Sequence, residues 1–210
     1  MKISYAITVC NELEEIKRLL DLLLENKREQ DEIVVLVDNP GGEDNEMISL
    51  LYQYESHNLD HMCVWRSEFE GHFANWKNKL TSYCKGDYIF QIDADEYPHP
   101  YFIKDLPAIL EHNSAVELYA VPRINTVEGL TQEHIQKWRW QINDNGWVNW
   151  PDFQTRIYKN IPDIKWKNKV HEVLDGHKEF CYLPMSEEYA LFHPKSIDRQ
   201  EKQNNYYNTL

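Results

Sequence analysis

The residues best suited to chemistry are four in a row, Asp93-Ala94-Asp95-Glu96, at the end of an apolar stretch that starts at residue 87. Side chains alternate along a strand, so Asp93 and Asp95 are predicted to point the same way where the strand ends. Two neighbouring carboxylates repel each other and are stable when they share a proton or a cation. Mg²⁺ and Mn²⁺ prefer oxygen ligands and commonly add substrate phosphates to one or two protein carboxylates. The pattern predicts a divalent-metal site; a solvated acidic turn is the alternative.

The formal net charge of the 210-residue chain is −13 at pH 7, which limits its partners. A nucleic-acid binder needs a basic face, and docking on anionic lipid also depends on basic residues, so both classes are disfavoured. An acidic protein can still bind a diphosphate if it recruits a divalent cation. The charge balance therefore favours a metal-assisted site and predicts no nucleic-acid partner.

The cysteines and the apolar runs bear on the cellular location. The cysteines at 10, 63, 84 and 181 are scattered and lack the paired spacing of zinc sites, so reduced thiols are expected. No apolar run approaches the roughly 20 residues of a membrane span. The first residues read as a strand and not as a signal peptide. We expect a cytoplasmic protein without a membrane span.

Two buried strands at 3–9 and 32–38, joined by a helix, must position the next polar groups. The linking helix has apolar residues at helical spacing, and ligands of doubly wound sheets bind at the carboxyl ends of such strands. Asn11 and Glu12 follow the first strand, and Asp38 ends the second. A carboxylate there can accept a hydrogen bond from a base or a ribose hydroxyl, and Asn11 can equally cap the helix.

The remaining elements complete an α/β pattern. Helices are predicted at 44–55, 72–85 and 101–112, and strands at 61–65, 87–93, 116–124, 154–159, 164–174 and 189–194. The alternation of apolar and polar residues in 154–159 and 164–174 is typical of half-exposed antiparallel strands. The tail from residue 197 is predicted to be helical or frayed. The order of elements predicts one domain with a parallel half followed by a mixed half.

Several of these stretches together resemble the family 2-type glycosyltransferases of the GT-A fold. The matching stretches are ITVCNE, EIVVLVDNPGGED, WKNKLTSYCKGDYIFQIDADE, PDFQTRIY, VHEVL and LFHP. They cover nearly the whole chain, and their combination is specific whereas the D-x-D pattern alone is not. The last stretches are similar to the subgroup that includes lipopolysaccharide-core glucosyltransferases, and chlorella-virus capsid glycosyltransferases offer a similar compact example.

The resemblance implies a single GT-A domain, an α/β fold, over residues 1–210. A Rossmann-like, nucleotide-sugar-binding half would cover 1–98 and an acceptor-side half 99–210. It implies an inverting enzyme that moves a hexose from a nucleotide-diphosphate sugar to a hydroxyl of a glycan, glycoprotein or glycolipid, with a UDP-sugar as the expected donor. It also implies Mn²⁺ or Mg²⁺ as the cofactor.

The same resemblance implies donor contacts from both halves. Val9, Asn11 and Glu12 would lie beside the base, Asp38 at the base or ribose, and Asp93 near the ribose. The full set implied to contact the donor is Val9, Asn11, Glu12, Asp38, Lys77, Asn78, Asp93, Ala94, Arg123, Lys195 and Arg199.

Basic residues in this set depart in part from the family pattern. Lys77 and Asn78 match an Arg-Asn pair that usually precedes the D-x-D strand, and lysine keeps the charge but loses the two-pronged guanidinium. Arg123 is expected to reach the donor sugar or a phosphate, with a surface ion pair as the alternative. Lys195 and Arg199 are expected to clamp the diphosphate as a closing lid, with a solvated helix start as the alternative.

Asp95 is expected to bind the metal directly, with Asp93 beside it. His193 resembles the late histidine that completes the metal site in several GT-A enzymes. His171 is the other candidate ligand. Histidine residues are also common at structural and surface positions.

The catalytic base lacks a clear match, since no helix opened by the usual Glu-Asp pair is evident. Asp152 and Glu172 are the candidates. Asp152 is favoured because Trp150 and Pro151 would desolvate its carboxyl group and raise its pKa toward a useful range. The tryptophans within 138–151 are expected to form an acceptor platform, with core packing as the alternative.

Two other classes stay open. A sugar nucleotidyltransferase or another metal-dependent phosphoryl enzyme would also use a metal ion, but its glycine-rich activating loop or early aspartate nucleophile is missing. A non-enzymatic carbohydrate-binding module would use tryptophan platforms. Such modules are usually β-sandwiches, and the β-α-β opening disfavours that class.

Overall fold

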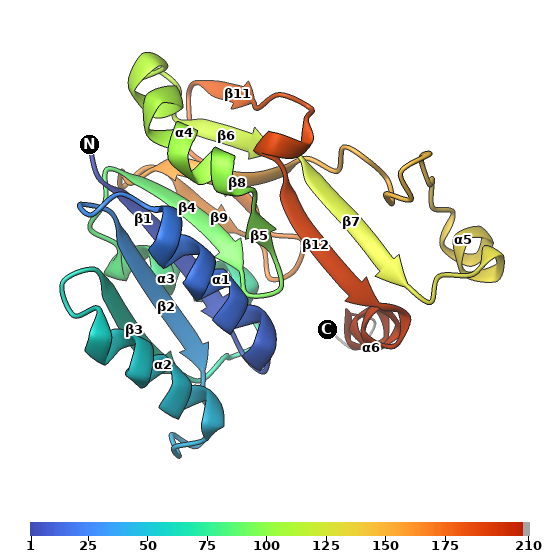
Figure 1. Cartoon of the computed structure of the whole chain (residues 1–210), viewed down its shortest axis with the longest axis horizontal. Coiled ribbons are helices and arrows are strands. Elements are labelled where there is room, and N and C mark those ends of the chain that lie inside the picture. The colour runs from blue at the N-terminus through green and yellow to red at the C-terminus, as the bar shows by residue number, and fades with distance from the viewer. Residues whose placement is uncertain (208–210) are drawn as a thin grey trace.

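A seven-stranded mixed sheet forms the centre of the computed structural model, which describes residues 1–207 and the side chains of residues 1–204 (Figure 1). The strand order is β11-β6-β8-β4-β1-β2-β3. Its strands are β1 (Ile3–Val9), β2 (Glu32–Asp38), β3 (Met62–Ser67), β4 (Tyr88–Asp93), β6 (Leu118–Val121), β8 (Gln154–Lys159) and β11 (Phe180–Tyr182). Strands β1 to β4 run parallel, whereas β8 pairs antiparallel with both β4 and β6. The predicted α/β class with a mixed sheet is confirmed.

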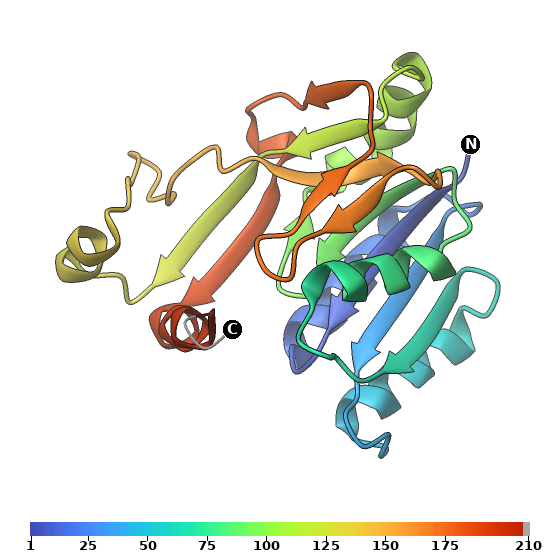
Figure 2. The same ribbon diagram turned by 180° about the vertical axis from the view of Figure 1, so that it is seen from behind.

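Helices cover both faces of this sheet, as a parallel sheet requires. Figure 1 shows α1 (Leu13–Asn26), α2 (Glu46–His57) and α4 (Pro100–His112) in front of it. Figure 2 shows α3 (Phe73–Tyr83) on the opposite face, beside the short hairpin of β9 (Lys165–Lys167) and β10 (Val173–Asp175).

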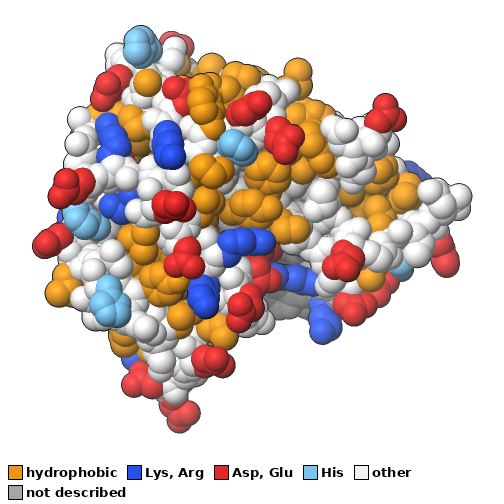
Figure 3. Space-filling view, viewed as in Figure 1, with side chains coloured by type: hydrophobic (Ala, Val, Ile, Leu, Met, Phe, Trp, Pro, Cys, Tyr) orange, Lys and Arg blue, Asp and Glu red, His pale blue; other side chains and the backbone are white. Residues whose placement is uncertain are grey.

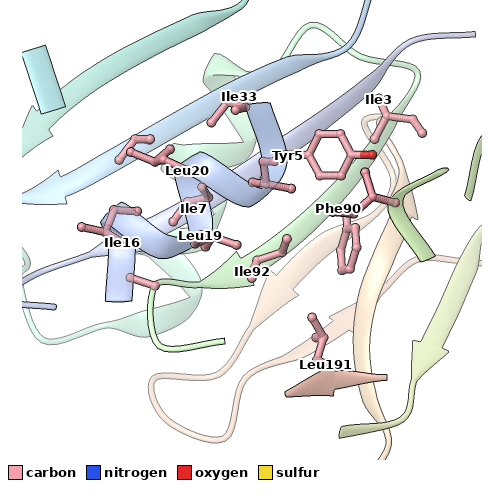
Figure 4. Close-up of a cluster of buried hydrophobic side chains, with 14 of the residues drawn as sticks. Ile3, Tyr5, Ile7, Ile16, Leu19, Leu20, Ile33, Phe90, Ile92 and Leu191 are labelled. Carbon is pink, nitrogen blue, oxygen red and sulfur yellow. The ribbon is translucent and has the colours of Figure 1, made fainter. Parts of the chain in front are cut away.

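Strand β1 is buried on both sides because its alternate residues enter two different cores. Ile3, Tyr5 and Ile7 pack toward α1, where Figure 4 shows them with Leu19 and Leu20. The side chain of Ala6 belongs to the second core, beneath α3. Full burial of one such aliphatic side chain stabilises the fold by about 1.5–3 kcal/mol. The rigid parallel strands fix the positions of the residues at their carboxyl ends.

A second, three-stranded sheet of order β5-β12-β7 projects from the main body (Figure 1). It contains β5 (Tyr97–Pro98), β7 (Arg123–Glu128) and β12 (Leu191–Ser196), and β7 runs parallel to β12. Helix α6 (Ile197–Tyr207) follows β12, so the tail is helical as far as 207, and 208–210 lie outside the described residues.

The structure corrects two predicted strands. The strand expected at 116–124 is divided at Pro122 into β6 of the large sheet and β7 of the small one, because proline has no N–H for a ladder. The strand expected at 164–174 is divided into β9 and β10 by a loop in which Asn168 and His171 have φ of 77° and 52°.

The sequence did not predict helix α5 (Gln132–Trp138) or the short 3₁₀ turn η1 (Glu187–Tyr189). Helix α5 begins with a capping box in which Thr131 and His134 satisfy each other's backbone N–H groups. Over the described chain, no helix combines the length and apolar content needed to cross a membrane.

A buried carboxylate, Glu32, fastens three chain segments at the amino-terminal edge of the sheet. Its oxygens accept hydrogen bonds from Lys2 Nζ at 2.5 Å, Ser4 Oγ at 2.6 Å and the Lys85 N–H at 2.5 Å. Gly86 is required here, since a Cβ would lie 2.6 Å from the Ser4 nitrogen. Burial acts to raise the pKa of Glu32, but these three donors outweigh it and hold the pKa below its usual value.

Replacing Glu32 by glutamine is therefore expected to lower the free energy of unfolding at pH 7 by about 1–3 kcal/mol. Because the folded-state pKa is depressed, this stabilisation is present above the unfolded pKa of about 4.3 and is lost as pH falls through the folded value. Urea unfolding at pH 7 and at acid pH measures it, with the exposed Glu29→Gln as the control. A deficit that is unchanged at acid pH would contradict the assignment.

Candidate functional site

A cleft of about 940 Å³ opens at the carboxyl ends of β1, β2 and β4. Its opposite wall is formed by β7, β12 and α6. Figure 3 shows acidic and basic side chains gathered where the main body meets the projecting small sheet. The predicted site residues that line the cleft are Val9, Asn11, Glu12, Asp38, Lys77, Asp93, Ala94, Asp95, Arg123, Asp152, His171, Glu172, His193 and Lys195. The fold thus brings together residues from both halves of the chain.

Asp93 is held by the protein itself. Its carboxylate accepts hydrogen bonds from Arg156 Nη2 at 2.7 Å, Gln91 Nε2 at 2.9 Å and Thr8 Oγ1 at 3.1 Å, and Lys77 Nζ lies 3.9 Å away. Burial acts to raise the pKa of Asp93, but Arg156 and Lys77 hold it well below its usual value. Both oxygens are thus engaged by protein donors, and a role for Asp93 as a metal ligand stays a prediction.

Asp95 points to different partners from Asp93. Strand β4 ends at Asp93, so the residues after it form a turn and the predicted alternation was wrong at this point. Asp95 Oδ2 lies 3.3 Å from His193 Nε2, 3.5 Å from Arg199 Nη2 and 3.9 Å from Lys195 Nζ. Burial acts to raise the pKa of Asp95, but His193 and Lys195 outweigh it and lower the pKa to about 2.

His193 is oriented by Asn125. The Asn125 amide nitrogen donates to Asp152 Oδ2 at 2.6 Å, so its amide oxygen faces His193 Nδ1 at 2.7 Å and accepts the Nδ1–H. Burial lowers the pKa of His193 despite the opposing effect of Asp95, which favours the neutral ring. Nε2 lies 3.3 Å from Asp95 Oδ2, so the two side chains pair. Loss of a proton from Nε2 would leave two acceptors at this distance, which a cation can bridge.

The donor set fits a divalent ion that takes its other ligands from a substrate. Asp95 and His193 supply one carboxylate oxygen and one neutral imidazole nitrogen, a combination suited to Mn²⁺. Among the residues that the structure describes, no group of three or more histidine, cysteine or acidic side chains is placed to hold a metal. His171 lines the cleft from the loop between β9 and β10 and stays the other candidate ligand.

Asp152 lines the cleft, but its predicted environment was wrong. Its Oδ2 accepts from Arg123 Nε at 2.9 Å, from Arg123 Nη2 at 2.7 Å and from Asn125, while Oδ1 accepts from Gln154 at 2.9 Å. Burial acts to raise the pKa of Asp152, as expected from Trp150. The charge of Arg123 and the hydrogen bonds outweigh burial, so the pKa lies below its usual value.

Glu172, the other candidate base, is paired with a buried lysine. Lys77 Nζ donates to Glu172 Oε1 at 2.5 Å and lies 4.7 Å from the centre of the Trp166 ring. The pair belongs to the wall formed by α3 and the β9–β10 hairpin, across the cleft from the small sheet.

Two predicted donor contacts lie outside the cleft lining. Asn78 exchanges two hydrogen bonds with the backbone of Trp166, which fastens β9 to α3, so its expected place beside the nucleotide is corrected to a structural one. Arg199 spans from α6 to Glu15 at 2.6 Å and to Glu12 at 3.0 Å. Glu12 itself precedes α1 and accepts the backbone N–H groups of residues 10 and 11, so Asn11 is not the helix cap.

Two buried charges at the cleft had no predicted role: Arg156 was not singled out, and Glu96 was named only as part of the acidic cluster. Arg156, on β8, lies beside Asp93, and its Nη2 donates at 2.6 Å to Glu96, whose side chain has no exposed surface. Arg123 Nη1 donates to the same Glu96 oxygen at 2.9 Å. A signal was present: Arg156 is a charged residue within an otherwise core-forming strand segment, and such residues are nearly always paired.

Solved structures with a similar architecture include S. aureus TarS in several forms. TarS 1–349 in complex with UDP-GlcNAc gives a TM-score of 0.66 at 16% identity, over 93% of this chain and 59% of that chain. Its complex with UDP gives 0.65 over 92% and 60%, and a longer TarS gives 0.64 over 90% and 36%, both at 16% identity. The chain thus spans less than two thirds of these structures. At such identity the likeness concerns the fold, which is GT-A.

The fold and the cleft define a glycosyltransferase domain of the GT-A class. No curated protein matches the sequence. The model of "Glycosyl transferase family 2" matches residues 4–176, so the chain belongs to that family. The family resemblance noted in the sequence is confirmed.

The ion pairs of Arg156 and those of Arg199 are expected to differ in their contribution to the free energy of unfolding. Replacing Arg156 by glutamine leaves Asp93 with Lys77 at 3.9 Å and Glu96 with Arg123 as their remaining cations, and is expected to cost about 3–5 kcal/mol of stability. The Arg199 pairs are about one-third exposed, so Arg199→Gln is expected to cost less than about 1 kcal/mol. Urea unfolding of both variants measures this. Equal losses would refute the assignment of Arg156 as the main structural cation.

Proposed function

We propose that this chain is a metal-dependent, inverting glycosyltransferase that moves a hexose from a UDP-sugar to a hydroxyl of a glycan or glycoconjugate. One observation carries the proposal. Asp95 Oδ2 and His193 Nε2 lie 3.3 Å apart just beyond the end of β4, with Lys195 and Arg199 beside them. This arrangement suits a divalent ion and the diphosphate of an activated sugar.

The donor would occupy the half formed by residues 1–98. Val9, Asn11 and Asp38 lie at the ends of β1 and β2, where they can contact the base and ribose. Asp93 is ionised and is fixed by Arg156, so it can accept a hydrogen bond from a ribose hydroxyl without moving. TarS, whose fold is similar, has been solved with UDP and with UDP-GlcNAc, which supports UDP as the nucleotide.

The reaction would proceed by a single displacement. The acceptor hydroxyl attacks the anomeric carbon, the bond to the nucleotide diphosphate breaks on the opposite face, and the hydroxyl proton passes to a carboxylate. Mn²⁺ or Mg²⁺, held by Asp95 and His193, would neutralise charge on the leaving diphosphate. Lys195 and Arg199 would add positive charge on the same side.

Asp152 is the proposed base, with Glu172 as the alternative. Its depressed pKa keeps the carboxylate ionised at neutral pH, and Arg123 fixes its direction. Oδ1 receives a hydrogen bond from Gln154 and is less occupied than Oδ2. This atom would take the acceptor proton. Glu172 is less favoured because its ion pair with Lys77 lies on the opposite wall.

The acceptor would be held in the half formed by 99–210, where a tryptophan-rich segment borders the cleft. Trp138 and Trp140 lie 4.6 Å apart between ring centres, and Trp147 and Trp150 lie 4.9 Å apart. All four are partly exposed and α5 buries none of its residues, so these rings are not core. Trp140 lines the cleft, and half-exposed indole rings suit stacking against sugars.

Replacing Asp95 by asparagine is expected to remove the Mn²⁺-dependent part of UDP binding. In thermal-shift assays, the wild-type Tm should rise more with UDP and Mn²⁺ together than with UDP alone, because a ligand stabilises the folded state according to its affinity. The Asp95→Asn variant should show the same shift with and without Mn²⁺. A variant that keeps the full Mn²⁺-dependent shift would exclude Asp95 as a ligand.

Replacing Asp152 by asparagine is expected to leave UDP affinity unchanged and to lower kcat for release of nucleotide diphosphate from the donor. General-base catalysis is worth about 10²–10⁴-fold, which sets the expected loss. Steady-state kinetics with calorimetric UDP titration measures both quantities. Retained activity would transfer the role to Glu172, and release of pyrophosphate in place of UDP would identify a nucleotidyltransferase.

A further inference from the structure

Seven charged side chains of alternating sign form a row of successive ion pairs along the cleft. In order they are Asp152, Arg123, Glu96, Arg156, Asp93, Lys77 and Glu172. The N···O distances of successive pairs are 2.7, 2.9, 2.6, 2.7, 3.9 and 2.5 Å. The first and last of these side chains, Asp152 and Glu172, are the two candidate bases, one on each wall of the cleft.

Glu96, the third of these seven side chains, cannot touch a substrate. Its side chain has no exposed surface, and it is not part of the cleft lining. One oxygen accepts from both Arg123 and Arg156, and the other lies 3.3 Å from the Asp93 backbone nitrogen. Glu96 can therefore act on the reaction only through these neighbours.

The two arginines depend on Glu96 for their positions. Both guanidinium groups donate to the single oxygen Oε1, so their positive charges lie close together in a region with little solvent. Without an anion between them they would repel each other strongly. Arg123 also donates a hydrogen bond to Asp152, and Arg156 also donates one to Asp93. A shift of either guanidinium would move the carboxylate that it holds.

We propose that Glu96 is a positioning residue that holds Asp93, on the donor side, and Asp152, on the acceptor side, in place through Arg156 and Arg123. The inference rests on the proposed function, since it assigns both carboxylates to the transfer site. It predicts that one buried residue affects donor affinity and turnover together, whereas Asp152 affects turnover alone.

The test compares Glu96→Gln with Glu32→Gln, a buried glutamate at the far edge of the same sheet. Wild-type protein is first assayed with Mn²⁺ for UDP release from a panel of UDP-sugars, with water as the acceptor, and the most active donor is kept. Both variants are then assayed at a temperature where circular dichroism shows them folded. In Glu96→Gln, kcat and UDP affinity are both expected to fall by about 10- to 100-fold, the usual cost of a lost supporting residue. Glu32→Gln should match the wild type in both.

The outcomes separate the two proposals. If the wild type releases no UDP from any donor, the proposed function fails before any variant is compared. If the wild type is active and Glu96→Gln loses kcat alone, affinity alone or neither, the positioning role of Glu96 is refuted. If Glu96→Gln does not fold, Glu96→Asp replaces it, with Glu32→Asp as its control. A fall in both kcat and UDP affinity of Glu96→Asp, smaller because the charge is kept, then supports the positioning role, and any other result refutes it.

Discussion

The buried salt bridge between Arg156 and the acids Asp93 and Glu96 is the interaction on which the site depends. These acids follow or end β4 in the centre of the large sheet, where removal from water would otherwise disfavour their charge. Arg156 comes from the antiparallel strand β8, beside β4, and therefore reaches them directly. A strand from the second half of the chain thus neutralises the acids of the first half.

This arrangement divides the labour between Asp93 and Asp95. Asp93 is satisfied by protein donors and serves as a fixed, ionised acceptor for hydrogen bonds. Asp95 instead lies beside His193 Nε2, with the cationic side chains of Lys195 and Arg199 nearby. An acidic chain with a net charge of −13 thereby places two cations, Lys195 and Arg199, at the corner proposed for the diphosphate.

The parts of the fold that were predictable from the sequence are those set by local pattern. The strands at 3–9 and 32–38 match β1 and β2 to the residue, because continuous apolar runs mark strands that are buried on both faces. The break at Pro122 was missed because the apolar pattern runs through it, although proline chemistry could have revealed it. The cleft residues at strand ends followed from the same logic.

The electrostatics of the site were not predictable, because the deciding partners are distant in sequence. Asp152 was expected to have a raised pKa from its neighbour Trp150, yet Arg123 lies 29 residues away in the chain and reverses the sign. Glu96 and Arg156 are separated by 60 residues. The pairing of Asp95 with His193, across 98 residues, was anticipated from family resemblance and not from local physics.

A crystal structure of the protein with Mn²⁺ and UDP tests the central claim most directly. The ion is expected on Asp95 and His193 and against the diphosphate, with Asp93 still bound to Arg156. An ion bound elsewhere, or a diphosphate outside this corner, would contradict it.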